Sequence, residues 1–357
     1  MPPTKPDLPR WKGLLAGTAM LALLLAPGVS RAGELLPDIK TLPPTEISLE
    51  VNEEGQHLLR FTQGFANLGP GPLRVRGVPT GQPDLMHGYQ EILDAEGNLA
   101  RSLPISSIIF HPHHKHWHAG DFASYELRRG SPWGELAAKN GKISYCLVDH
   151  SPFSEYTGRY HPPTYLNCKT PSQGLNPGWL DLYEASLYDQ WVDVTGVADG
   201  VYFLTITGDP QHVYLEADHG DWANNIAWVK VELSDGARQV RVMAPNEILV
   251  RLDGKRLEFP VYPRIEENRA LAHLRLVEHL GAAVHWDGTK AIVTRGLKRL
   301  EITPGMSTAL VNGAPVDMGT AALLENHRLL IPVRFLGEQL GFTVTYDPLT
   351  ATVQIAG

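Results

Sequence analysis

The stretch Val201-Tyr-Phe-Leu-Thr-Ile-Thr207 has the aromatic and β-branched composition of a buried β-strand. Similar strand-like runs occur at residues 143–148, 190–195 and 226–233. Between Leu36 and Ser234 no amphipathic helical pattern stands out. We therefore expect a mainly β protein whose first domain is all-β, with a β-sandwich core.

Upstream of these runs, residues 47–75 alternate between apolar and polar side chains. The alternation is interrupted at Asn52-Glu-Glu-Gly55 and at Gly69-Pro-Gly-Pro72, which are turn signals, so hairpins are expected here. Long Pro-rich loops are predicted at 78–88 and 150–180. Loops of that length in a compact domain usually carry function.

The C-terminal part of the chain contains a repeat with an offset of about 60 residues. Val284-His-Trp-Asp287 matches Val344-Thr-Tyr-Asp347, and Asp253-Gly254 matches Asn312-Gly313. Each unit is predicted to be a hairpin, a helix and a closing hairpin. We expect residues 33–240 and 241–357 to form separate domains, the second a small α+β domain to which we assign no chemistry.

The first 32 residues have the pattern of a secretory signal peptide. Basic residues precede an apolar run at 13–29, and small residues occupy the cleavage positions around Ser30-Arg31-Ala32. We expect export to the extracellular space, cell envelope or periplasm, with no transmembrane span after cleavage. An uncleaved membrane anchor is the alternative.

The chain has a formal charge of −8, which becomes −11 once residues 1–32 are removed. Nucleic acid and anionic surfaces are therefore poor partners, while cationic ligands are favoured by long-range electrostatic steering. A merely soluble protein would show the same charge.

Five of the 15 histidines lie between His111 and His118. In a strand, His114, His116 and His118 share one face, so we expect them to bind one metal ion. A flat strand would spread them over about 13 Å, and ligands meet an ion at about 2 Å, so the strand must bend. Imidazole suits copper, zinc, iron or nickel. A low-complexity tract and a structural zinc site are the alternatives.

Three ordered segments resemble the lysyl oxidase family over about residues 36–233. They are the run at 114–118 followed by Asp121, the stretch Lys142-Ile-Ser-Tyr-Cys-Leu147, and residues 172–183 followed by 190–195. The resemblance implies copper on His114, His116 and His118. It also implies a lysyl tyrosylquinone (LTQ) cofactor made by cross-linking Lys142 to Tyr183.

Such a quinone would oxidise a primary amine, peptidyl lysine among the candidates, to an aldehyde, with release of ammonia and of hydrogen peroxide from dioxygen. The resemblance gives no general base. His111 lies on the other side of Pro112 and His113 has no assigned role. Asp121 either orients a ligand histidine or occupies a turn.

The family resemblance also suggests a calcium site with hard oxygen ligands. Its candidate residues are Asp38, Ile39, Glu216, Asp218, Asn224 and Asn225. The alternative is a solvated acidic loop in which the two asparagines make turn hydrogen bonds.

Cys146 and Cys168 are the only two cysteines, and in an exported protein they are expected to form a disulfide. Closing this loop would stabilise the fold by about 3 kcal/mol.

The C-terminal domain resembles the N-terminal stalk domain of copper amine oxidases. The similar segments are Ile331-Pro-Val-Arg-Phe-Leu-Gly337 and Leu340-Gly-Phe-Thr-Val344. This resemblance implies a bacterial exported protein and a spacer or cell-envelope contact.

The sequence therefore predicts a copper-dependent amine oxidase. The main rival is a non-catalytic copper- or zinc-binding cell-envelope protein that never forms the quinone. A zinc hydrolase with a metal-bound water is a third reading, although no glutamate base lies in the histidine run.

Overall fold

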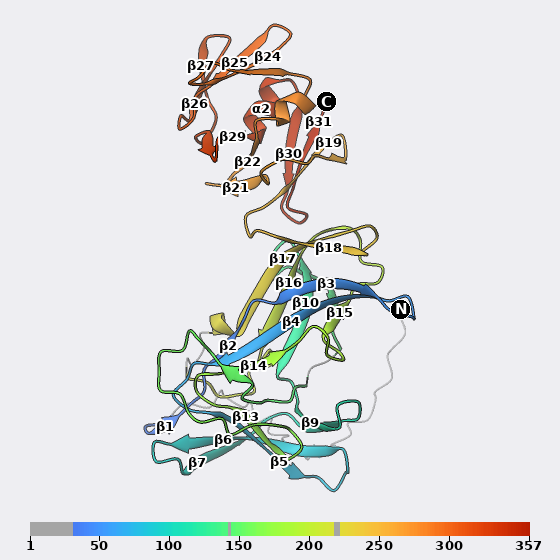
Figure 1. Cartoon of the computed structure of the whole chain (residues 1–357), viewed down its shortest axis with the longest axis vertical. Helices are drawn as coiled ribbons and strands as arrows, with labels where there is room; N and C mark the ends of the chain where they lie inside the picture. The colour runs from blue at the N-terminus through green and yellow to red at the C-terminus, as the bar shows by residue number, and fades with distance from the viewer. Residues whose placement is uncertain (1–30, 142–143, 218–221) are drawn as a thin grey trace, which may run out of the picture.

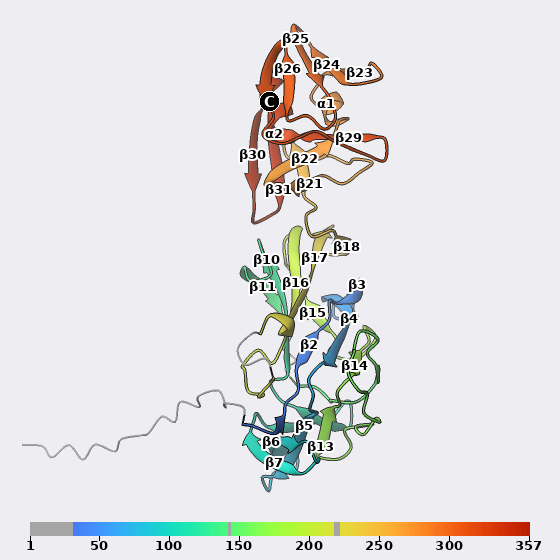
Figure 2. The same ribbon diagram turned by 90° about the vertical axis from the view of Figure 1, so that its left-hand side faces the viewer.

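The computed structural model describes residues 31–141, 144–217 and 222–357. The predicted signal peptide lies outside these residues, apart from Arg31 and Ala32. Two lobes stack along the long axis of the molecule (Figures 1 and 2), and the prediction of a mainly β protein is confirmed. In the part of the chain that the structure describes, no helix is long and apolar enough to cross a membrane.

The first lobe contains three antiparallel sheets. The first sheet consists of β1 Glu34–Leu35, β5 Leu73–Pro79, β6 Leu85–Asp94, β7 Leu99–Pro104, β8 Ile108–His111, β9 His116–Ala119 and β13 Ser172–Leu175. The second consists of β10 Ala123–Arg129, β11 Glu135–Lys139, β16 Gly200–Gly208, β17 Ile226–Ser234 and β18 Gln239–Met243. The third consists of β2 Ile39–Thr41, β3 Thr45–Val51, β4 His57–Asn67, β12 Ser151–Pro152, β14 Trp179–Tyr183 and β15 Trp191–Asp193. A 3-10 turn, η1 Trp222–Asn225, precedes β17.

Strand β4 lies at the centre of the first lobe and is buried at almost every residue. It pairs with β2 and β14 along one stretch and with β3 and β15 along another. Phe61 and Phe65 project from it into a core of edge-to-face aromatic rings that includes Phe122 and Tyr125. This apolar packing holds the loops of the first lobe in place.

Most of the expected strands are present, with three corrections. One of them is that the loop predicted at 150–180 is interrupted by β12 and β13 and ends where β14 begins at Trp179. Strands β16 and β17 cover the runs predicted at 201–207 and 226–233. The strand predicted at 143–148 is not formed by residues 144–148, which are the part of it that the structure describes. Among them only Tyr145 makes a β-bridge, to Ala119. The loop predicted at 78–88 is also too long, because β5 and β6 remain paired as far as Pro79 and Met86. Proline is tolerated there because it ends a strand.

The second lobe is built from three smaller sheets and two short helices. Its strands are β19 Leu249–Leu252, β20 Lys255–Arg256, β21 Arg264–Glu266, β22 Arg269–His273, β23 Ala283–Trp286, β24 Ala291–Arg295, β25 Lys298–Ile302, β26 Thr308–Val311, β27 Ala314–Asp317, β28 Leu323–Glu325, β29 Arg328–Pro332, β30 Thr343–Asp347 and β31 Thr352–Ala356. The helices are α1 Leu276–His279 and α2 Val333–Gln339.

The repeat noted in the sequence is also a repeat of structure. Hairpins β19–β20 and β26–β27 turn at Asp253-Gly254 and Asn312-Gly313, and all four of these residues have positive φ. After each of these hairpins come a second hairpin, a short helix and a closing hairpin. The left-handed turn conformation explains why Asn, Asp and Gly recur at these positions.

Buried ion pairs join the two lobes. Glu232 of β17, 5% exposed, accepts hydrogen bonds from Arg241 of β18 at 2.9 and 3.1 Å, and it also pairs with Arg256 of β20 in the second lobe. Arg241 reaches Glu247, between the lobes, at 2.6 Å. Val201 and Met243 of the first lobe pack into the second lobe's core. The joint is therefore ionic at its edge and apolar at its centre.

Candidate active site

The histidine run folds as a hairpin. Strand β8 ends at His111, strand β9 begins at His116, and these two residues are paired across the hairpin. His114 lies in the connecting turn, which includes Lys115 at φ +56°. On the opposite face Trp117 packs edge-on against Phe110, with ring centroids 5.4 Å apart. The turn supplies the bend that a flat strand lacks, and it gathers the imidazoles on one face.

Nitrogens of the three predicted ligands converge. The Nε2 atom of His118 lies 3.0 Å from Nε2 of His116 and 3.3 Å from Nδ1 of His114. Two nitrogens bound to one ion at about 2.0–2.1 Å lie about 2.9–3.3 Å apart for right-angled to tetrahedral geometry. His118 is 1% exposed, while the other two are half-buried. The residues whose ligand atoms all lie within 4.8 Å of one another are His111, His114 and His118, and His116 approaches His118, so the imidazoles of this hairpin fit a metal ion without selecting the predicted three.

His111 also belongs to this cluster, although Pro112 separates it in the sequence from the three predicted ligands and the sequence leaves its role open. Its ring stacks on His118 with centroids 4.7 Å apart, and ligand atoms of His111, His114 and His118 lie within 4.8 Å of one another. The Nε2 atom of His111 faces a carboxylate oxygen of Asp189 at 3.4 Å. The signal that would have found His111 is the turn-forming Pro112, because a hairpin brings residues on both sides of a turn together.

His113 points outward and is exposed. Its ring stacks on Tyr188 with centroids 4.7 Å apart. Tyr188, itself 48% exposed, also lies edge-on to His114. The loop that contains Tyr188 and Asp189 therefore covers one side of the histidine cluster.

The segment from Ser144 to Cys146 links the histidines to Tyr183. The Oγ atom of Ser144 lies 3.3 Å from Nδ1 of His118. Tyr145 exchanges two backbone hydrogen bonds with Ala119, and its ring centroid is 5.2 Å from that of Tyr183. The carbonyl oxygen of Cys146 accepts a hydrogen bond from the Tyr183 hydroxyl. The three consecutive residues 144–146 thus connect the strand that carries His118 with Tyr183.

Tyr183 is the last residue of β14 and is 7% exposed. Oδ2 of Asp181 lies 2.9 Å from the same hydroxyl oxygen, so it and the Cys146 carbonyl share the single phenolic proton as acceptors. Burial, followed by the negative charge of Asp181, raises the pKa of Tyr183 well above its usual value. The phenol is therefore held in its protonated form, with its oxygen in a fixed position.

The other half of the predicted cofactor, Lys142, lies outside the described residues. Asp121 has φ +52°, in a turn, and accepts a hydrogen bond from Ser106 at 2.5 Å. The second ring nitrogen of His118 faces Ser144, so Asp121 does not orient that histidine.

Cys146 and Cys168 form the predicted disulfide, with Cα atoms 5.7 Å apart. Each half-cystine is also hydrogen-bonded to part of the centre. Cys146 accepts from Tyr183, and the carbonyl of Cys168 accepts from the backbone N–H of Trp117 at 2.9 Å.

Five of the six candidate calcium ligands lie together, and the sixth, Asp218, lies outside the described residues. Asn224 donates to Asp38 at 2.6 Å, and Asn225 donates to Glu216 at 2.8 Å. Glu216 also accepts from the backbone N–H of Ile39 at 2.5 Å. Among the described residues, the buried Oδ1 atoms of both asparagines have no hydrogen-bond partner. Carboxylates beside two unused amide oxygens fit a hard cation.

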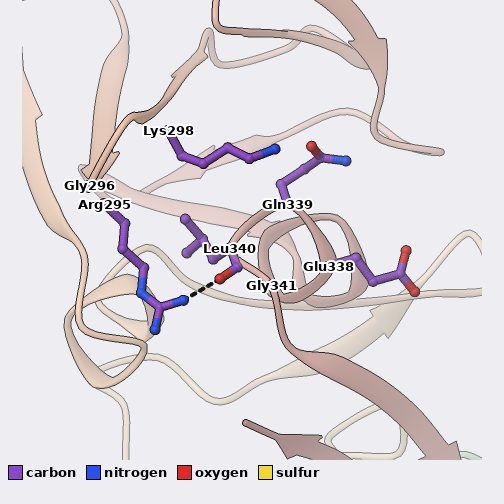
Figure 3. A pocket seen from close by; sticks show the side chains of 7 residues that line it. All are labelled: Arg295, Gly296, Lys298, Glu338, Gln339, Leu340 and Gly341. Atoms are coloured by element: carbon purple, nitrogen blue, oxygen red, sulfur yellow. Dashed lines mark hydrogen bonds between the residues drawn. The ribbon is translucent and has the colours of Figure 1, made fainter.

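A hollow of about 380 Å³ lies in the second lobe, at the other end of the molecule from β9 (Figures 1 and 3). Arg295 lines it, but its guanidinium donates to the carbonyl of Leu340. Lys298 and Glu338 are the other charged residues of this wall. No histidine or cysteine lines it, so it offers no metal ligands comparable to those of the first lobe.

Two family models match the chain. Residues 91–243 match lysyl oxidase, and residues 251–355 match the copper amine oxidase N-terminal domain. The chain therefore carries a lysyl oxidase domain followed by a copper amine oxidase N-terminal domain.

Curated relatives agree with the first match. The chain is 36% identical over 126 residues to protein-lysine 6-oxidase of Gallus gallus, covering 35% of this chain and 28% of that protein. It is 34% identical over 126 residues to protein-lysine 6-oxidase of Sus scrofa, covering 35% and 47%. Lysyl oxidase homolog 1 of Homo sapiens is 34% identical over 118 residues, covering 33% and 19%. The matches thus span less than half the length of each relative.

Proposed function

We propose that this chain, with its lysyl oxidase domain, is a copper-dependent amine oxidase that oxidatively deaminates primary amines, peptidyl lysine among them. The supporting observation is the link between two groups of residues: His118 and the buried Tyr183 both contact the segment from Ser144 to Cys146. A metal-binding cluster and an oxidisable ring are thereby held in a single framework.

His114, His116 and His118 would hold copper, and Lys142 and Tyr183 would form the lysyl tyrosylquinone. When formed, this quinone supplies an electrophilic carbonyl that accepts the amine and two of its electrons. Around it, Asp181 and the carbonyl of Cys146 orient the Tyr183 oxygen. The rings of Tyr145 and Phe65 pack against Tyr183 and exclude water from it.

The overall reaction balances with dioxygen and one water. The carbon that bears the amine loses two electrons and becomes an aldehyde, its nitrogen leaves as ammonia, and dioxygen takes the electrons and two protons as hydrogen peroxide. A cationic amine suits the first lobe, since residues 33–244 contain 15 Lys and Arg against 26 Asp and Glu.

Peptide mass spectrometry of copper-loaded, aerobically matured protein tests the proposal. We expect a cross-linked peptide pair containing Lys142 and Tyr183, a phenylhydrazine-reactive chromophore, and amine-dependent peroxide. Tyr183→Phe should abolish all three while retaining copper. Tyr214→Phe is the matched control, because Tyr214 is another buried tyrosine of the same lobe, 2% exposed, and should leave all three unchanged. Bound copper without cross-link or peroxide in the unaltered protein would instead identify a metal-binding protein.

We also propose that residues 1–32 direct export, which suits a disulfide-bonded protein, and that the second domain contacts the cell envelope. Fractionation of cells producing the full chain and a chain ending at residue 244 tests both points. The full chain should be exported and partly retained with the envelope, whereas the shortened chain should be exported and released.

The cluster of Asp38, Ile39, Glu216, Asn224 and Asn225, together with Asp218, is proposed to bind calcium. Excess calcium should raise the Tm of the unaltered protein through preferential binding to the folded state. Glu216→Gln should remove this response and leave copper binding intact. An equal shift of Tm in both proteins would contradict the assignment.

A further inference from the structure

Asp181 and Tyr183 are two residues apart on β14 and therefore share one face of the strand. This face points into the core, where Asp181 is 1% exposed. Its carboxylate accepts the hydrogen bond of the Tyr183 hydroxyl at 2.9 Å. Burying a carboxylate is costly, so a buried Asp181 next to the Tyr183 hydroxyl is a specific arrangement whose chemistry can be asked about.

We infer that Asp181 is the base that removes the phenolic proton of Tyr183 during formation of the quinone. This inference rests on the proposed function and adds to it a catalytic residue for cofactor formation. The Tyr183 O–H bond breaks, its electron pair stays on the phenol oxygen, and the proton passes to the Asp181 carboxylate.

The overall conversion of a phenol to an ortho-quinone by dioxygen is balanced. One oxygen atom of dioxygen enters the ring, and the other leaves as water with the phenolic hydrogen and one ring hydrogen. The phenolic proton must therefore leave at some stage. In a site from which bulk water is excluded, a group within hydrogen-bond distance is needed to receive it.

Two other described groups near the Tyr183 ring or its oxygen are poor candidates. The carbonyl of Cys146 accepts a hydrogen bond, but an amide oxygen is too weak a base to take the proton. The Tyr145 phenol is fully buried, which raises its own pKa well above the usual value, so it cannot serve as a base at neutral pH. Asp181 is the carboxylate for which a contact with this hydroxyl is observed.

Asp149, a second buried carboxylate of this lobe, shows what a structural role looks like. It is 5% exposed, and its oxygens accept hydrogen bonds from the backbone of Thr164, Tyr165 and Asn176. These contacts fix the loop after β12. Asp181 differs because its observed contact is with the hydroxyl that must lose a proton.

Cofactor formation in copper-loaded protein, started by adding oxygen, tests the inference. We expect Asp181→Asn to form the quinone chromophore and the Lys142–Tyr183 cross-link at least about 100-fold more slowly, the usual contribution of a positioned base. The residual rate should rise with pH because hydroxide replaces the carboxylate. Asp181→Glu, which keeps a base, should recover part of the rate.

Two controls exclude a simple loss of structure. Asp149→Asn removes a buried carboxylate without touching Tyr183 and should leave the rate of cross-link formation of the folded fraction unchanged. Copper content and near-ultraviolet circular dichroism report the folded fraction for each variant. If Asp181→Asn unfolds, Asp181→Glu still tests the inference. If Asp181 only filled space, Asp181→Glu would leave the rate of cross-link formation and its pH dependence unchanged.

Ultraviolet titration of the copper-free protein gives a readout that does not depend on turnover. Removing the Asp181 charge should lower the pKa of Tyr183, since that charge now opposes the phenolate. A lower phenol pKa with slower oxidation is the signature of a lost base. A purely electrostatic role predicts faster oxidation instead.

The outcomes separate the two claims. If the unaltered protein makes the cross-link and Asp181→Asn makes it equally fast, the inference about Asp181 is overturned and the proposed function stands. If the unaltered protein never makes the cross-link, both fall.

Discussion

The first lobe has purely antiparallel sheets and the second has smaller sheets, one of which includes the parallel pair β19–β31, and among the described residues only the first lobe contains a cluster of histidines suited to metal binding. In the second lobe the strands are joined by tight hairpins whose turns repeat. In the first lobe, a long connection between β12 and β13 and the segment 144–150 run across the sheets. The candidate site of the first lobe therefore combines strand residues of β8, β9 and β14 with the irregular segment that runs between them.

Charge separates the lobes as well. Residues 33–244 have 11 more acidic than basic side chains, whereas residues 245–357 have 12 of each. A neutral second lobe does not repel the acidic first lobe, so close packing at the joint is electrostatically tolerable. The acidic lobe can still attract cationic amines.

The largest expected effect is on metal binding. His118→Ala removes the imidazole whose Nε2 faces both His114 and His116. Copper affinity should fall by more than about 100-fold, since even outer-sphere changes cost 10–100-fold. Competitive titration with a chelator measures the change. His285→Ala, an exposed histidine of β23 in the second lobe, should have no effect; equal losses in both variants would remove the distinction between the lobes.

Loss of the disulfide should destabilise only the first lobe. Replacing Cys146 and Cys168 together with alanine frees a loop with a sequence separation of 22 and should lower the free energy of unfolding by about 3 kcal/mol. Urea unfolding followed by tryptophan fluorescence measures this loss. An unchanged midpoint would show that the loop is held by its other contacts alone.

Breaking the ion pairs between the lobes should lower the free energy of unfolding by less than loss of the disulfide does, but by a measurable amount. Glu232→Gln leaves Arg241 and Arg256 without their shared carboxylate. Because both arginines are partly exposed, we expect a loss of about 2 kcal/mol. Thermal unfolding should then separate into two transitions, one for each lobe. Glu338→Gln, which removes an exposed pair with Arg334, should change neither the stability nor the number of transitions.

A pH dependence of the first lobe's stability is expected from Asp209. Burial raises the pKa of Asp209 to about 6 from its usual 3.8. The folded state therefore binds a proton more tightly than the unfolded state, so this contribution to stability is present below pH 3.8 and is lost as pH rises through about 6.

Urea unfolding between pH 4 and 7 measures this contribution, and Asp209→Asn should flatten the decline. Asp287 in the second lobe gives a control of opposite sign. Hydrogen bonds from Thr289 and Lys290 lower the pKa of Asp287, so its contribution is lost as pH falls through that lowered value. A decline that persists in Asp209→Asn would assign the pH dependence to another group.

Sequence patterns predicted the features that depend on local order. Alternation and composition identified β16 and β17, and turn residues identified the repeated hairpins of the second lobe. The disulfide followed from the presence of two cysteines alone. The strands and turns could be predicted because each depends on a few neighbouring residues, and the disulfide could be predicted because the chain has two cysteines.

Features that depend on long-range contacts were missed. Residues 144–148 look like a strand, but Leu147 donates its N–H to the Gln173 side chain, while Tyr145 bonds to Ala119. A buried segment can satisfy its backbone by such scattered contacts without joining a ladder. His111 was unassigned because only the hairpin turn returns it to the cluster. Asp181 was not singled out either, because its burial and its contact with Tyr183 depend on the packing of β14 in the core.

The position of the disulfide also bears on the order in which the proposed centre is assembled. Its two carbonyl groups hold opposite partners, Tyr183 through Cys146 and the backbone of Trp117 through Cys168. A reduced chain lacks the covalent tie between these partners, so metal uptake and ring oxidation would find them out of register. If the proposed centre forms, we expect thiol oxidation to precede it, and an oxidising compartment would then support its assembly as well as its preservation.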